Sequence, residues 1–86
     1  MKFVRDSDRP LSNPDAAARK LLDIVRGSIA ESGLRYAYTG ATNTAFTDAG
    51  GSVADYLTGM RHGSAQKWFE VDRSGTRIIL LPDGAE

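Results

Sequence analysis

The first clear pattern of apolar positions predicts a helix over residues 14–32. Asn13 can cap its start by accepting a hydrogen bond from a free backbone N–H, and Pro14 suits the first helical position. Asp15 would face the positive end of the helix dipole, and Gly33 can adopt the left-handed conformation that commonly ends a helix. Small and apolar residues recur at steps of three and four and form one stripe: Ala17, Leu21, Ile24, Val25, Ser28 and Ile29.

A second helix is predicted to begin at Ser52, which has with Asp55 the spacing of a capping box. Gly59 and Gly63 weaken this helix, so its end is predicted between residues 62 and 67. Gly27 in the first helix destabilises that helix by about 1 kcal/mol relative to alanine. Either a closely packed neighbour requires the small residue there, or the domain simply tolerates this destabilisation. One face of the second helix carries Val53, Tyr56, Leu57, Met60 and Ser64, and Asp55, Thr58, Arg61, His62 and Ala65 lie on or near the other.

Three further runs predict strands. Residues 34–39 are rich in aromatic side chains and lie between two glycines. Residues 68–72 and 76–81 are separated by a short break that contains a glycine, which is typical of an antiparallel hairpin, and a proline stops the last strand. Residues 40–51 are mostly small and polar, with Phe46 as the only large side chain. The sequence is compatible with either a loop or one short turn of helix here.

These elements predict an α+β, winged-helix-like domain over residues 13–82, with flexible tails at 1–12 and 83–86. It would contain two main helices, a possible short one, and a small antiparallel sheet that ends in a C-terminal hairpin, the wing. In a winged helix the helix before the hairpin is the recognition helix, here residues 52 to about 66. A helix pair on a three-stranded sheet without DNA-binding geometry is the alternative. The predicted core is Leu21, Ile24, Val25, Ile29, Tyr56, Leu57, Met60 and either Trp68 or Phe69.

The chain contains four characteristic segments: residues 3–6 (FVRD), 13–21 (NPDAAARKL), 51–56 (GSVADY) and 74–76 (SGT). With these segments it resembles a group of small uncharacterised bacterial proteins of similar length, and the similarity covers most of the chain. The resemblance implies no established activity and no functional residues. The chain departs from the pattern of that group just before the hairpin, where Lys67 precedes Trp68 in place of an expected glycine.

Composition narrows the class of protein. The 86 residues are enough for one domain, and a hydrophobic fraction of 41% is too high for a disordered chain. The chain has no cysteine, which excludes disulfides and thiolate metal sites and fits a reducing cytoplasm. The first residues lack the apolar stretch of a signal peptide, and the longest apolar run, residues 78–81, is far too short to span a membrane.

The chemistry that the sequence offers does not indicate an enzyme. His62 is the only histidine, is expected at the surface, and has no second ligand at metal-binding spacing, so no metal or cofactor is predicted. Residues 50–52 could hold an anion on free N–H groups before a helix, but a loop followed by an N-cap is the favoured interpretation. No carboxylates pair in a predicted pocket, so acid–base catalysis is not predicted.

A winged helix would place a few residues against nucleic acid, namely Thr58, Arg61, His62, Arg73 and Arg77. The net charge over residues 52–81 is only +1, from four basic and three acidic residues, whereas a specific binder neutralises about 6–10 phosphates. Exposure of Tyr38 or Trp68 would favour a protein-binding surface. The leading hypothesis is therefore a non-catalytic module that binds a protein partner or itself. The alternative is a weak DNA-binding winged helix.

Overall fold

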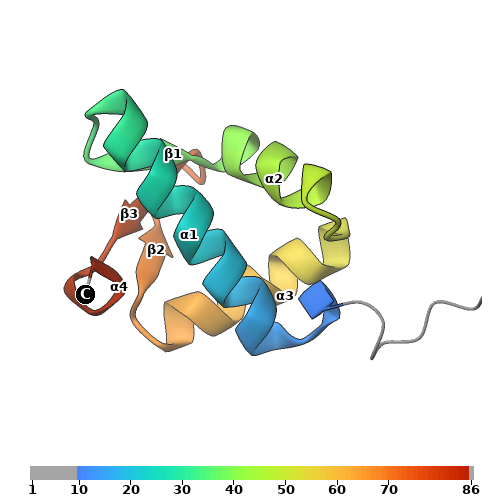
Figure 1. The fold of residues 1–86 in the computed structure, drawn as a ribbon. Helices are drawn as coiled ribbons and strands as arrows, with labels where there is room; N and C mark the ends of the chain where they lie inside the picture. The colour runs from blue at the N-terminus through green and yellow to red at the C-terminus, as the bar shows by residue number, and fades with distance from the viewer. Residues whose placement is uncertain (1–9, 86) are drawn as a thin grey trace, which may run out of the picture.

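The computed structural model describes residues 10–85, and these form an α+β fold (Figure 1). The order of elements agrees with the predicted helix, strand, possible short helix, helix, strand, strand, with one short helical element added at each end. In chain order the elements are η2 (Pro10–Ser12), α1 (Pro14–Ser32), β1 (Tyr36–Tyr38), α2 (Thr39–Asp48), α3 (Val53–Ala65), β2 (Phe69–Val71), β3 (Arg77–Leu80) and α4 (Pro82–Ala85).

Local signals fix both ends of α1, as predicted. The Asn13 side chain accepts a hydrogen bond of 3.0 Å from the Ala16 N–H. Gly33 has a φ of 74°, and its N–H donates to the Ile29 carbonyl at 2.9 Å. One N–H group at the start of α1 and one carbonyl group at its end, which have no partner within the helix, thus gain a hydrogen bond.

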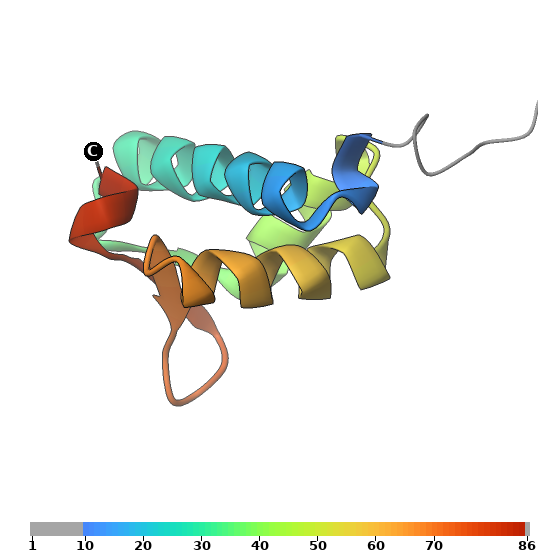
Figure 2. The ribbon, with the colours of Figure 1, turned by 90° about the horizontal axis from the view of Figure 1, so that it is seen from below.

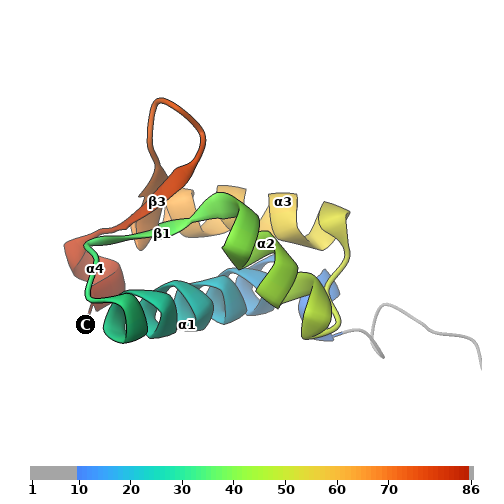
Figure 3. The same ribbon diagram turned by 90° about the horizontal axis from the view of Figure 1, so that it is seen from above.

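The three strands form an antiparallel sheet in the order β1-β3-β2. The predicted hairpin is confirmed, because Phe69 pairs with Leu80 and Val71 with Ile78. The first strand is shorter than predicted and covers only Tyr36–Tyr38. The hairpin projects past α3 on the side away from α1, as Figures 2 and 3 show.

The segment after β1 is a helix of 10 residues, longer than the one short turn that was the alternative to a loop. Its threonines are poor helix formers, but Phe46 is fully buried and its ring centroid lies 6.0 Å from that of Tyr56 on α3. The hydroxyls of Thr44 and Thr47 donate to carbonyls of preceding helical residues at 3.1 Å. Tertiary burial of one aromatic ring therefore outweighs the weak local preference.

The core contains most of the predicted residues but not all of them. Leu57 is 51% exposed, so its predicted place in the core is wrong. Ile24, Ile29 and Trp68 are half-buried and pack against the core. The buried core cluster is Ala17, Leu21, Val25, Ala37, Phe46, Tyr56, Met60, Phe69 and Ile78.

Glycines decide which face of α3 is buried. A Cβ at Gly59 would lie 2.8 Å from Leu21 Cδ1 and 2.9 Å from the Ala17 Cβ, and a Cβ at Gly63 would overlap the Phe69 ring. The face with these glycines therefore allows α1 and the sheet to approach α3 closely, and Leu57 lies off that face. At Gly27, by contrast, a Cβ would meet no atom within 4 Å, so tolerance explains this glycine.

The turn after α3 needs a left-handed residue, and Lys67 fills it with a φ of 61°. Its N–H donates to the Ser64 carbonyl, and the Trp68 N–H donates to the Gly63 carbonyl, both at 3.0 Å. This is the hydrogen-bond pattern of a Schellman cap, in which the left-handed position is usually glycine. Lys67 thus occupies a position whose backbone favours glycine.

Both ends of the described chain contact the domain. Leu11 in η2 packs against the core, and the N–H of Leu81 donates to the Trp68 carbonyl at 3.0 Å. Gly84 in α4 is buried against the same carbonyl. Packing therefore continues beyond the predicted boundaries of 13 and 82, while the predicted flexibility of the tails stays a prediction. Residues 1–9 and 86 lie outside the described residues.

Candidate interaction surface on α3 and the hairpin

Binding was predicted on α3 and the hairpin, and α2 adjoins both of them. The short turn of residues 49–52, which contains two glycines, joins α2 to α3. The Thr39 N–H donates to the Thr76 carbonyl, and the Thr39 hydroxyl donates to the Gly75 carbonyl at 3.0 Å. The start of α2 is thereby tied to the tip of the hairpin.

The predicted contact residues do not all lie together. Thr58 and Arg61 are exposed on α3, and Arg73 and Arg77 are exposed in the hairpin. His62 keeps part of its side chain at the surface but is half-buried and points towards α1, where it bonds to Asp15 and so lies apart from the other four residues.

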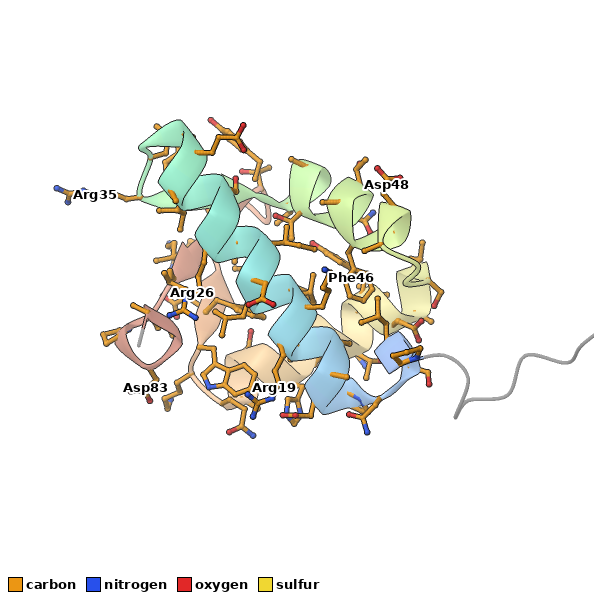
Figure 4. All side chains as sticks on the ribbon, in the orientation of Figure 1. Arg19, Arg26, Arg35, Phe46, Asp48 and Asp83 are labelled. Atoms are coloured by element: carbon orange, nitrogen blue, oxygen red, sulfur yellow. The ribbon has the colours of Figure 1, made fainter. Side chains whose placement is uncertain are left out.

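His62 belongs to a closed ring of four side chains. Its Nε2 lies 3.2 Å from Asp15 Oδ1, and the other Asp15 oxygen accepts a 2.8 Å bond from Arg19 Nε. The Arg19 guanidinium carbon lies 5.1 Å from the centroid of the Trp68 ring. The centroids of the Trp68 and His62 rings are 6.1 Å apart. The hydrogen bond from Arg19, together with that from His62, lowers the pKa of Asp15. This ring links α1, α3 and the start of the hairpin, and Figure 4 shows Arg19 on that side of α1.

The outward side of α3 is largely apolar at its start. Val53 is 60% exposed and Leu57 is 51% exposed, and the two lie one helical turn apart. A recognition helix reads base edges with residues near its N-terminus, and such reading rests mainly on hydrogen-bonding groups. Val53 and Leu57 offer none, so the exposed polar groups on this helix are those of Thr58, Arg61 and Ser64. We call Val53, Leu57, Thr58 and Arg61 the α3 outer face.

The loop before α3 does not keep free donors for an anion. The Gly50 and Gly51 N–H groups donate to carbonyls of the last turn of α2, at 3.0 and 3.1 Å. The Ser52 N–H donates to Asp55 Oδ2 at 3.0 Å, and the Asp55 N–H donates back to the Ser52 hydroxyl. The favoured interpretation as a loop with an N-cap is confirmed.

The hairpin tip is organised around Asp72. Its carboxylate accepts hydrogen bonds from the Ser74 hydroxyl at 2.9 Å and from the N–H groups of Thr76 and Arg77 at 3.2 Å. Partial burial raises the pKa of Asp72, but these hydrogen bonds outweigh it, so the pKa lies below its ordinary value. The Arg77 guanidinium carbon lies 4.7 Å from the Tyr36 ring centroid. One of the three arginines expected to contact nucleic acid is therefore already packed on an aromatic ring.

The described surface also has two shallow grooves, both away from the α3 outer face. One of about 300 Å³ lies between α1 and α2, and one of about 370 Å³ lies beside Arg19, Arg26, Trp68 and Asp83. Within residues 10–85 no three His, Cys, Asp or Glu side chains are grouped to hold a metal ion. No helix in that range has the length and apolar character needed to cross a membrane.

Comparison with known proteins places the chain in no family. No protein-family model matches it, and no curated protein and no solved structure is significantly similar to it. The function must therefore be inferred from the surface itself.

Proposed function

We propose that this chain is a non-catalytic interaction module with a winged-helix arrangement, and that it binds a protein partner through the α3 outer face. The element order, the β1-β3-β2 sheet and the short glycine-containing turn between α2 and α3 support the winged-helix part. The absence of cysteine is compatible with a reducing cytoplasm, where we propose that the interaction takes place.

The observation that carries the choice of a protein partner is the exposure of Val53 and Leu57 on the helix that a winged helix presents to its ligand. Apolar side chains placed on a presented helix lose contact with water when a protein surface covers them, which is favourable. Against a duplex they would face charged phosphates and polar base edges. The net charge of +1 over residues 52–81 also favours a protein partner over DNA. So small a charge allows few of the phosphate contacts by which counterion release drives DNA binding.

Site-specific photo-crosslinking in cells tests this function. A benzoylphenylalanine in place of Leu57 should give a discrete crosslinked protein product, and the same group in place of the exposed Glu31 on α1 should not. Adding Val53→Asp to the Leu57 probe should abolish the product, because a carboxylate would then enter the apolar contact. A product of twice the chain mass would identify a second copy as the partner. Equal labelling from both positions, or no product from position 57, would refute the proposal.

Weak DNA binding is the second candidate, because the hairpin projects on the side of α3 away from α1 (Figure 2). Arg61 on α3 and Arg73 in the hairpin are both exposed. We expect an affinity for random duplex no better than about 10⁻⁵ M. An NMR titration at about 20 mM salt, where screening is weak, should then move the amides of Thr58, Arg61 and Arg73. Motionless amides would eliminate this candidate, and shifts that persist at about 150 mM salt would make it the leading one.

A further inference from the structure

The sheet has a second face that the helices do not bury. Ala37 and Ile78 point into the core and are fully buried. Because side chains alternate along a strand, their neighbours Tyr36, Tyr38, Arg77 and Ile79 lie on the opposite face, which we call the outer sheet face. Tyr38 is 48% exposed and Ile79 is 36% exposed.

The strand register gathers these four side chains into one cluster. Tyr36 is directly opposite Ile79, and Tyr38 is opposite Arg77. The two tyrosine rings meet edge to face with centroids 5.3 Å apart, and their hydroxyl oxygens are 3.3 Å apart. Arg77 stacks on the Tyr36 ring. Neighbours therefore hold these side chains in place before any partner arrives, which lowers the entropy lost on binding.

The stacked arrangement leaves polar groups available at the edge of the cluster. A guanidinium that lies over a ring still presents its N–H groups in its own plane, and these match the two oxygens of a carboxylate. In the tyrosine pair one hydroxyl donates to the other, and the accepting hydroxyl keeps its own hydrogen for a third group. The outer sheet face thus combines apolar contact area with donors suited to an anion.

The charges around this face are positive by a small margin. Arg35 is exposed just before β1 and extends away from the domain (Figure 4), and Arg73 is exposed at the hairpin tip. Glu70 lies on the same face, opposite Ile79, and the Asp72 carboxylate keeps its negative charge although it is hydrogen-bonded in the hairpin turn. The small excess that remains suits a single carboxylate and is far below the roughly 6–10 phosphates that a nucleic-acid site neutralises.

We propose that the outer sheet face is a second contact surface, which binds a short acidic segment of a partner protein in which an apolar side chain adjoins a carboxylate. The apolar side chain would pack on Tyr38 and Ile79, and the carboxylate would bind Arg77. A short segment is inferred because four side chains are far fewer than the roughly 20–30 residues a side that a standard interface between folded proteins uses. The proposal does not depend on the α3 outer face, whose residues are different.

Selection from a library of random linear heptapeptides on the immobilised protein tests this proposal. Peptides in which Asp or Glu lies beside an aromatic or aliphatic residue should be enriched over the input. Tyr38→Ser should lower binding of an enriched peptide about tenfold or more, the scale of an interface aromatic. Arg77→Glu should change the selection to peptides with Lys or Arg. Both side chains are exposed, and the amide spectrum of each variant checks that it is folded.

Lys67→Glu is the matched control, since it makes the same charge change in an exposed cation outside both proposed surfaces, and it should leave the selected sequences unchanged. The proposal is overturned if acidic peptides are not enriched, if Arg77→Glu selects the same peptides, or if only Lys67→Glu alters the selection. An oligothymidylate that shifts the Tyr36 and Tyr38 amides at about 150 mM salt would instead identify a nucleic-acid surface. None of these results bears on crosslinking from position 57, so the two proposals fail separately.

Discussion

A matched pair of leucine substitutions tests the orientation of α3, on which the proposed surface depends. Leu21 on α1 is fully buried and Leu57 on α3 is 51% exposed, and both can be changed to alanine within a helix. Leu21→Ala removes a fully buried side chain and leaves a cavity, so it should lower the free energy of unfolding by about 2–5 kcal/mol. Leu57→Ala removes a side chain that is half in contact with water and leaves no enclosed cavity.

The expected loss at Leu57 follows from its burial. Full burial of a leucine is worth about 1.5–3 kcal/mol, so half burial gives about 1 kcal/mol, slightly reduced by the higher helix propensity of alanine. Urea titrations of both variants against the unchanged chain measure the difference, and a constant slope shows that both unfold alike. Equal losses, or a loss above about 2 kcal/mol at Leu57, would show that this face of α3 is buried and that the proposed surface does not exist.

Three further predictions concern glycine positions and acid stability. Gly27→Ala should stabilise the fold by up to about 1 kcal/mol, because the added Cβ meets open space. Gly59→Ala should lose that gain, because its Cβ would overpack against α1 at a cost of about 1–3 kcal/mol. Thermal unfolding that ranks the two variants alike would contradict this. Lys67→Gly should stabilise by about 0.5–1 kcal/mol, since the cost of a left-handed L-residue exceeds the entropic cost of glycine, and Lys67→Ala should give no such gain in the same titration. The pKa of Asp72 lies below its ordinary value of 3.8, so its carboxylate stabilises the fold fully above that pH and the contribution is lost as pH falls through the lowered pKa. The difference in unfolding free energy between the unchanged chain and Asp72→Asn should therefore be constant from about pH 5 to 7 and shrink below about pH 4, and a difference that grows in acid would refute the sign.

Local chemistry determined much of this fold from the sequence alone. The ends of α1 follow from a capping side chain at Asn13 and a left-handed glycine at Gly33, both of which act on the nearest turn of backbone. The capping box at Ser52 sets the start of α3, and Gly75, with a φ of 76°, supplies the turn of the hairpin. Each of these interactions joins residues a few positions apart, so their types and spacing suffice to predict the structure.

Tertiary packing decided the rest. The segment 39–48 is helical because Phe46 is buried against another helix, which its weak local propensity does not indicate. The buried face of α3 is set by Gly59 and Gly63, since a face without side chains can approach its neighbours most closely, and this leaves Leu57 in solvent although its type and spacing predicted burial. In the candidate site, too, the sequence predicts some features and tertiary packing decides others. Arg61 and Arg73 lie on exposed positions as predicted, but the partner of His62 is 47 residues away in sequence, a contact that only the packing of α1 against α3 creates.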